Sequence, residues 1–401
     1  MWAGYPPKEA PTTTSAMGST IHLNIKGAHS MTNTQELSTT PFHAYHIKNG
    51  AKMVDFAGWE MPLLYGSIID EHQQVRESGG LFDVSHMGRL KFTGKDACNV
   101  LDRLCTRQIH GMQNGQIRYS LICNAQGGCR DDVLVYKIKD NDYLMVCNGA
   151  NREKILSHID EIRGNFQFKL EDETESTAMI ALQGPKVMEL LGAISTEIAE
   201  LKRYRFTTKN LLIAKVLISR TGYTGEDGVE VILPAKFATK AIDVMLKKMG
   251  DAPSVKPTGL GARDSLRLEA GMPLYGHELT EEIDPLSAGL SFAVKLDKGV
   301  GENEAEPFIG QEALQAISKN GSSTKLVGLK LEGKRSPRQH MHVLHDGETI
   351  GEVTSGCLSP TFGYPIAMAY IPSDFEGDTV GLDYGKKIIP ASIVPLPFYK
   401  K

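Results

Sequence analysis

The sequence predicts an α+β protein in which two ferredoxin-like α/β units form a cleft and a small β-barrel domain follows. Three observations support this fold class. The 401 residues are enough for about two to four domains. Strand and helix patterns follow one another in a similar order over two consecutive segments. Beyond residue 320 only strand patterns occur, with turns at a spacing of about 8–12 residues, which favours a barrel or a sandwich.

The composition excludes several classes of protein. Hydrophobic residues make up 41% and charged residues 23% of the chain, which excludes a largely disordered or collagen-like protein. The 44 basic and 48 acidic residues give a net charge of -4, so we expect neither nucleic acid nor a membrane as a partner. The six cysteines form no CxxC pair. We therefore expect reduced thiols and a cytoplasmic protein, or a protein of the mitochondrial matrix if the source is eukaryotic.

The first part of the chain divides into a leader and the beginning of a domain. Residues 1–36 are rich in Thr, Pro and Ser and contain no arginine, so we interpret them as a disordered leader or as an extension foreign to the natural protein. Residues 37–88 then open the first α/β domain. Within them Ile69, His72 and Val75 have helical spacing, and the glycines at 79–80 predict a glycine C-cap.

Residues 89–170 form the second predicted α/β domain, the more clearly ferredoxin-like of the two. Leu90 and Phe92 alternate as in a strand, and the apolar residues of 97–105 recur with helical spacing. The remaining elements are predicted as strands at 117–123, 132–138 and 143–147, a helix at 155–162 and a strand at 165–170.

An acidic run at 171–175 marks the return to the first domain, which we assign to residues 37–88 and 171–319. The barrel domain takes residues 320–401. The elements predicted in the returning segment are strands at 177–182, 211–218 and 229–233 and helices at 185–192, 236–249 and 259–271.

The standard signatures of nucleotide and metal sites are absent from the sequence. There is no GxxxxGK[ST], HExxH or GxSxG motif, and the glycines at 259 and 261 do not follow a strand pattern. The pair His43 and His46 lacks further ligands at metal spacing, and the histidines at 340, 342 and 345 suit an exposed strand. We therefore expect no metal and no nucleotide.

One polar cluster lies on a predicted hairpin. Tyr119 is on one strand, and Asp131 and Asp132 open the facing strand after two turn glycines. Because side chains alternate along a strand, the two carboxylates point to opposite faces, so one of them could face a cleft while the other meets water. The alternative is that these carboxylates cap backbone amides of the turn.

Two further polar clusters follow. The connection 220–230 holds three glycines around Tyr223 and ends at Glu230, whose carboxylate could accept two parallel hydrogen bonds from a guanidine-like ring edge. An elaborate hairpin is the alternative. Arg263 and Arg267 lie four residues apart on one helix face, where like charges repel, so each needs a ligand or a structural acidic partner.

Taken together, these segments resemble the aminomethyltransferase (T-protein) family of the glycine cleavage system, within the folate-binding aminomethyltransferase superfamily. The resemblance covers about residue 40 to residue 398. It rests on the segments MVDFAGWEMPLLYGSIIDEH (53–72), LFDVSHMGRL (81–90), GGCRDDVLVY (127–136), NGANREK (148–154), ALQGP (181–185), RTGYTGEDGVE (220–230), GLGARDSLRLEAGMPLYGHEL (259–279) and VTSGCLSPTFGYPIAMAYI (353–371).

The resemblance implies an activity and a set of site residues. The aminomethyl group on the dihydrolipoyl arm of a lipoylated H-protein would pass to the co-substrate tetrahydrofolate, giving 5,10-methylenetetrahydrofolate and ammonia. Asp131 matches the catalytic carboxylate of the family. The residues that match substrate-binding or folate-lining positions are Glu230, Arg263, Tyr119, Asn148, Tyr223 and Met87.

Two other functions remain open at this point. One is a folate-dependent demethylase that acts on a small methylated amine or sulfonium compound. The other is a non-catalytic folate-binding protein, although the KGC-type signature of such proteins is absent.

Overall fold

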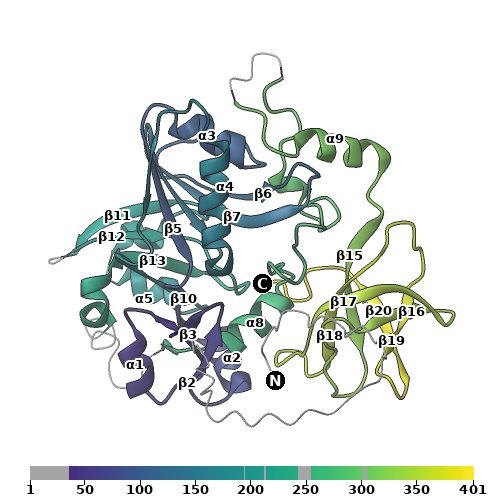
Figure 1. Ribbon diagram of the computed structural model, residues 1–401. Helices are drawn as coiled ribbons and strands as arrows, with labels where there is room; N and C mark the ends of the chain where they lie inside the picture. The colour runs from purple at the N-terminus through teal and green to yellow at the C-terminus, as the bar shows by residue number, and fades with distance from the viewer. Residues whose placement is uncertain (1–35, 194, 212–213, 243–253, 301–304) are drawn as a thin grey trace, which may run out of the picture.

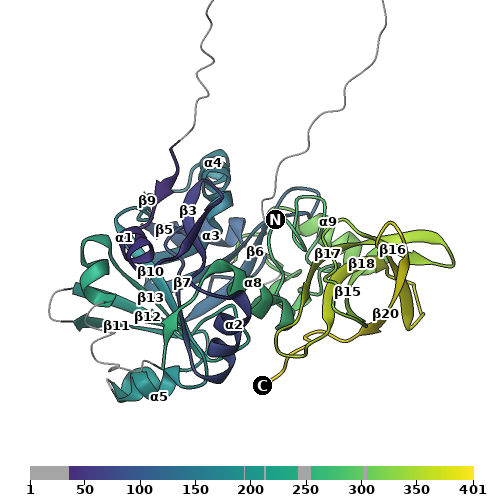
Figure 2. The same ribbon diagram turned by 90° about the horizontal axis from the view of Figure 1, so that it is seen from below.

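The computed structural model describes residues 36–193, 195–211, 214–242, 254–300 and 305–401 (Figure 1). The predicted leader lies outside these residues except for its last member, and so does the predicted helix 236–249 beyond residue 242. Two open sheets with their helices form one body, and a closed barrel lies beside it (Figures 1 and 2). None of the helices in the described ranges is long and apolar enough to cross a membrane. The α+β class and the barrel are thus confirmed.

The five-stranded sheet contains the elements of the second predicted domain in the predicted order. Its strand order is β6-β7-β8-β5-β9. The last strand begins later than predicted, because the acidic run itself pairs with β5, with Glu171 opposite Lys91. The elements are β5 (Gly88–Thr93), α3 (Ala97–Leu104), β6 (Ile117–Cys123), β7 (Cys129–Lys139), β8 (Asp142–Cys147), η1 (Gly149–Asn151), α4 (Arg152–Ile162) and β9 (Lys169–Asp172).

The six-stranded sheet has the order β11-β12-β13-β10-β4-β14. The strand predicted at 211–218 is β12, and the antiparallel strand β11 that precedes it was not predicted. The elements of this layer are β4 (Gly80–Asp83), β10 (Thr177–Gln183), α5 (Val187–Gly192), α6 (Thr196–Ala199), β11 (Phe206–Leu211), β12 (Ala214–Ser219), β13 (Gly228–Pro234), η2 (Ala235–Phe237) and β14 (Lys256–Pro257).

A smaller unit precedes the first of these strands. Three short strands, β1 (Ser38–Thr39), β2 (Lys52–Phe56) and β3 (Trp59–Leu64), form a sheet that the sequence did not predict, beside α1 (His43–Lys48). Helix α2 (Ile68–Glu77) occurs as predicted, but its C-cap is Ser78 and not a glycine. Gly80 opens β4 instead, and a Cβ there would lie 2.5 Å from the Val75 side chain. Close approach of strand and helix therefore explains this glycine.

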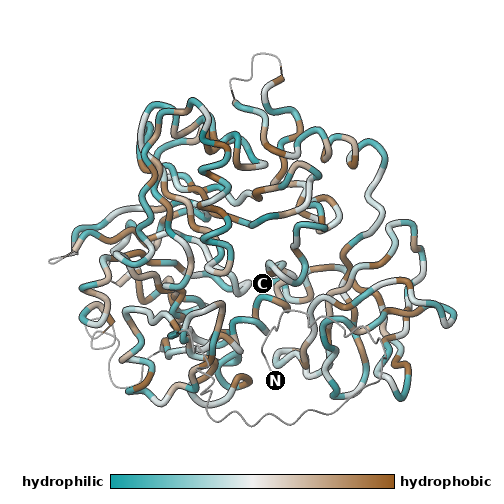
Figure 3. Tube along the Cα trace, in the orientation of Figure 1, coloured by the Kyte–Doolittle hydropathy of each residue, from teal (hydrophilic) through white to brown (hydrophobic). Residues whose placement is uncertain are grey.

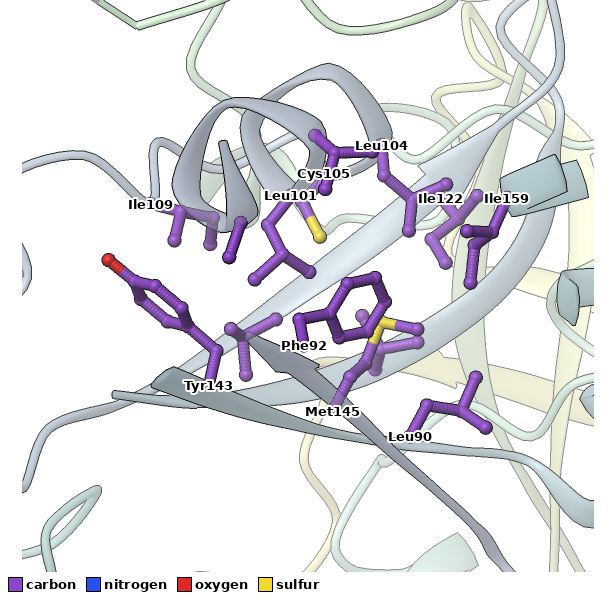
Figure 4. Packing of buried hydrophobic residues seen from close by; sticks show 14 of the residues in the cluster. Leu90, Phe92, Leu101, Leu104, Cys105, Ile109, Ile122, Tyr143, Met145 and Ile159 are labelled. Carbon is purple, nitrogen blue, oxygen red and sulfur yellow. The ribbon is translucent and has the colours of Figure 1, made fainter. Parts of the chain in front are cut away.

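Side chains alternate between the two faces of each open sheet, so each sheet has an outer face and an inner face. Leu90, Phe92 and Met145 pack under α3 and α4 on the outer face of the five-stranded sheet (Figure 4). Leu144 and Val146, which point the other way, join a cluster that also contains residues of the six-stranded sheet. The two sheets therefore pack on each other through their inner faces. Tyr136 and Phe206 make one such contact, with ring centroids 5.5 Å apart.

The third domain is a closed barrel with the strand order β15-β18-β17-β16-β19-β20. Alternating residues of its strands, such as Val327, Leu329 and Leu331, fill its interior. Figure 3 colours the chain trace by hydropathy. The connecting and barrel elements are α8 (Leu260–Glu269), η3 (Ser291–Ala293), α9 (Gln311–Asn320), β15 (Thr324–Leu331), β16 (His342–His345), β17 (Glu348–Leu358), β18 (Pro365–Pro372), β19 (Thr379–Asp383) and β20 (Ile388–Val394).

The β6–β7 hairpin is held against the segment that follows α8. Asn124 closes the turn by accepting the Gly128 N–H at 2.9 Å and donates to the Glu281 carbonyl at 2.9 Å. A Cβ on Gly128 would lie 1.8 Å from that same carbonyl oxygen. No side chain fits in this position, so glycine sets how closely the hairpin can approach.

We predict that Gly128→Ala destabilises the protein by about 1–3 kcal/mol, because two backbone segments must separate. Gly66→Ala is the matched control: Gly66 is exposed, and a Cβ there meets nothing within 4 Å. We expect it to change stability by less than about 0.5 kcal/mol. Urea unfolding of both variants measures the difference, and equal midpoints would contradict the prediction.

Candidate functional site

Polar side chains interrupt the apolar contact between the inner faces. Asp132 lies on the same side of β7 as the inner residue Tyr136, four residues further on. Glu230 lies on the same side of β13 as the inner residue Ile232. Tyr119 donates a hydrogen bond from its hydroxyl to Asp132 Oδ2 at 3.2 Å. Two of the predicted residues, Tyr119 on β6 and Glu230 on β13, therefore share this space between the sheets with Asp132 on β7.

Asp131 lies on the opposite, helix-covered face of β7. Its side chain is fully buried and none of it meets water. Oδ1 accepts hydrogen bonds from the side-chain amides of Asn148, at 2.7 Å, and Asn151, at 2.6 Å. Oδ2 accepts the Asn148 backbone N–H at 3.1 Å. The Asn148 amide also donates to Asp132 Oδ1 at 2.8 Å, so one asparagine links both carboxylates.

The linked carboxylates hold a proton more tightly than isolated ones. Burial, together with the charge of Asp132, raises the pKa of Asp131 from 3.8 to about 7, and burial also raises the pKa of Asp132. The two groups titrate as a pair. Since the folded state binds this proton more tightly than the unfolded chain does, the Asp131 contribution to stability falls as the pH rises from about 4 through about 7.

Glu230 ends the glycine-rich connection that the sequence singled out. It is 6% exposed, and its Oε2 accepts a hydrogen bond from the Thr221 hydroxyl at 2.5 Å. In the same connection a Cβ on Gly222 would lie 1.9 Å from Gln183 Oε1, so the chain passes too close for any side chain. Tyr223 is fixed by donating its hydroxyl to the Pro273 carbonyl at 2.5 Å.

The two arginines of α8 have different surroundings. Arg267 donates to Asp264 and to Glu278, each at 2.9 Å, and is a structural group. Arg263 has a buried Nη1 atom without a hydrogen-bond partner among the described residues. Its guanidinium lies 5.0 Å from the Tyr223 ring centroid. Burial lowers the pKa of Arg263, while the charge of Glu230 opposes this shift. An unpartnered buried donor of this kind indicates a place for an acceptor on a ligand.

Two residues of the segment after β4 border the same region. Met87 packs at the edge of the inner cluster, half-buried. His86 was not singled out from the sequence, although it lies in the DVSHMG segment. Its Nδ1 is buried without a hydrogen-bond partner within the described part of the chain. Burial lowers the pKa of His86 to about 4, so the ring is neutral at pH 7.

The C-terminal tail packs behind the glycine-rich connection. The Tyr399 ring lies 3.9 Å from the Arg76 guanidinium carbon, and its N–H donates to the Glu269 carbonyl at 2.7 Å. The Lys401 ammonium pairs with Glu226 at 3.0 Å. The tail therefore supports the connection that carries Tyr223.

The structure thus joins most of the predicted site into one electrostatically linked set. Besides burial, Asp132 and Tyr223 raise the pKa of Tyr119, and Asp132 raises the pKa of Tyr223. Glu230 and Tyr223 oppose the lowering of the pKa of Arg263. Sequence reasoning did not single out Asn151 or His86. It predicts Asp131 as the catalytic carboxylate, and this stays a prediction; the structure places the neighbouring Asp132, on the same side of β7 as Tyr136, on the inner face.

Comparison with known proteins identifies the class to which this fold and site belong. Residues 42–298 match the model of the GCVT N-terminal domain, and residues 324–400 match that of the glycine cleavage T-protein C-terminal barrel domain. An α/β body with a linked polar set between its sheets, followed by this barrel, defines a class of transferases, the aminomethyltransferases.

Individual relatives agree with the family models. An aminomethyltransferase of Rubrobacter xylanophilus is 45% identical over 91% of this chain and 95% of its own length. One of Thermotoga maritima is 42% identical over 91% and 98%. The crystal structure of glycine cleavage system aminomethyltransferase T from Bartonella henselae superposes with a TM-score of 0.82 at 32% identity, covering 91% and 98%. The chain belongs to the glycine cleavage T-protein family and is an enzyme, an aminomethyltransferase.

The carboxylate pair gives a test of the site's electrostatics. We predict that Asp132→Asn lowers the pKa of Asp131 below its value of about 7, because the repelling charge is removed. Infrared titration of the protonated carboxyl band measures this pKa. Asp140→Asn, at an exposed carboxylate just beyond the other end of β7, is the control and is expected to leave the titration unchanged. A pKa that stays near 7 in Asp132→Asn would show that the pair is not coupled.

Proposed function

We propose that this aminomethyltransferase transfers the one-carbon unit from the aminomethylated dihydrolipoyl arm of an H-protein to tetrahydrofolate. A bond from the carbon to a folate nitrogen forms as the bond to the amine breaks, and ring closure on the second nitrogen frees the lipoyl thiol. The products are 5,10-methylenetetrahydrofolate, ammonia and the dihydrolipoyl arm. The observation that carries this proposal is the unpartnered Arg263 donor beside Glu230 in a member of the T-protein family.

The folate would bind through its flat ring. Glu230 keeps one carboxylate oxygen free of protein donors in the described chain, so it can accept from the guanidine-like edge of the ring. Arg263 Nη1 can donate to a ring acceptor, and the Tyr223 ring offers a flat surface. Tyr119 and Met87 would line the remaining path toward the carboxylates.

The carboxylate pair would divide the work. We assign the contact with the reacting nitrogens to Asp132, because it is partly exposed and shares the inner face with Tyr119. Asp131, the residue predicted from the sequence, becomes the positioning residue that fixes Asn148. A fixed carboxylate near the attacking amine orients it and manages its proton.

The proposal is tested by turnover with defined substrates. The protein is incubated with tetrahydrofolate and aminomethylated, lipoylated H-protein, and ammonia and methylenetetrahydrofolate are measured. We expect both products in equal amounts. Folate binding without ammonia release would refute the transfer and favour a folate-binding protein. Turnover of a methylated amine or sulfonium compound in place of the H-protein would favour a demethylase.

Asp132→Asn and Asp131→Asn separate the two carboxylate roles. We expect Asp132→Asn to lower kcat by about 10²–10⁴-fold, with the folate Kd changed less than about tenfold, since the lost group acts on the proton. Asp131→Asn is expected to lower kcat less, and to change the pH profile, because it acts through Asn148. The reverse order would return the substrate contact to Asp131. Asp140→Asn is the control.

Glu230→Ala reports on ring binding. Hydrogen bonds to a charged group contribute about 1.5–3 kcal/mol. We therefore expect their loss to raise the folate Kd by about 10- to 100-fold. Calorimetric titration with tetrahydrofolate measures this, with Glu352→Ala on the barrel surface as control. An unchanged Kd in Glu230→Ala would remove this residue from the site.

A further inference from the structure

A second group of chemically reactive side chains lies at helix α3, on the outer side of the five-stranded sheet. Cys98 and Asp102 are four residues apart and share one face of the helix. The Cys98 Sγ atom lies 4.0 Å from Asp102 Oδ2. His110, from the loop after α3, adds a ring nitrogen, and the three ligand atoms all lie within 4.8 Å of one another.

The hydrogen bonds of Asp102 leave one acceptor position directed at this group. Oδ1 accepts the Ile109 N–H at 2.6 Å and contacts the Lys298 ammonium at 3.1 Å. Among the described residues, Oδ2 accepts the His110 backbone N–H, at 3.0 Å, and has a weak contact with the Cys98 thiol. A carboxylate offers about four lone-pair positions, so the remaining one is on Oδ2, the oxygen 4.0 Å from the Cys98 sulfur.

The protein holds these groups in place before any ligand arrives. The Asp102 side chain is fully buried, and two backbone N–H groups fix its orientation. The bond from its own backbone N–H also anchors His110 at the carboxylate. Cys98 and His110 are half-buried, so solvent reaches the group from one side. A rigid acceptor with two half-exposed partners suits an ion that enters from solution.

We propose that Cys98, Asp102 and His110 form a Zn²⁺ site that is separate from the folate site. A thiolate, an imidazole and a carboxylate are ligands that Zn²⁺ accepts, with water in the fourth position. Tetrahedral bonds of about 2.0–2.3 Å place ligand atoms about 3.3–3.8 Å apart, so side-chain rotation closes the present spacing. The Zn–S bond forms as the Cys98 thiol releases its proton to solvent.

The neighbouring ammonium is compatible with the ion. Lys298 lies on Oδ1, not on the oxygen assigned to the metal, and it also donates to the carbonyls of Asp102 and Cys105, at 2.6 and 2.8 Å. The ordinary alternative is that Asp102 only caps the loop and that the thiol donates a weak hydrogen bond.

Cobalt(II) titration of the reduced full-length protein distinguishes the two interpretations, because a thiolate bound to cobalt gives a charge-transfer band. We expect this band in the natural sequence and in Cys357→Ser, which removes the other half-buried cysteine. We expect no band in Cys98→Ser. Zn²⁺ affinity, measured by calorimetry, is expected to fall by more than about tenfold in Cys98→Ser and in His110→Ala.

The cobalt charge-transfer band reports directly on whether a thiolate binds the metal. Absence of the band in the natural sequence overturns the proposal, as does a band that persists in Cys98→Ser, which would place cobalt at another thiol. Circular dichroism confirms that each variant is folded. If His110→Ala unfolds, Cys98→Ser alone decides, since serine replaces a half-buried thiol with a group of similar size.

Discussion

The structure depends on how its buried charged side chains find hydrogen-bond partners. The two sheets pack through apolar inner faces, and at one end of that contact the charged groups must find partners, since an unpaired ion there is costly. Arg267 meets the requirement with Asp264 and Glu278. Arg263 does not, because one of its nitrogens lacks an acceptor in the described chain. This contrast between two arginines on one helix is the reason we propose that a ligand completes the hydrogen bonding of Arg263.

Helix α8, which carries Arg263, is held against the barrel by hydrogen bonds of Glu269. Its Glu269 accepts hydrogen bonds from Ser359, at 2.5 Å, and from the Thr361 hydroxyl, at 2.6 Å, both of which follow β17. The same carboxylate pairs with Arg76 of α2 at 2.9 Å. The barrel thus contributes through contacts that set the register of the helix bearing Arg263.

The linked carboxylates show how one strand can serve two purposes. Adjacent residues of β7 face a helix layer and the space between the sheets, and Asn148 bridges them at the end of β8. The buried member is held by three donors, while the inner member remains partly accessible. Burial, together with the charge of Asp132, raises the pKa of Asp131 to about 7, which keeps a proton available near neutral pH. The hydrogen bonds that hold Asp131 on the helix-covered face of β7 therefore also position Asn148 beside Asp132 on the inner face.

The sequence by itself determined most of the local elements, the all-strand third domain and the family resemblance, but not the strands β1, β2, β3 and β11. Alternation at Leu90 and Phe92 and helical spacing through 97–105 are local, and the motif segments are contiguous in the chain. It also showed that Asp131 and Asp132 must face opposite ways. Only the tertiary structure decided which of them faces inward, and that Arg267 pairs with Glu278 while Arg263 stays open. The alternation of side chains along a strand places neighbouring residues on opposite faces of the sheet. Which face is the inner one depends on the side on which a segment distant in the sequence packs.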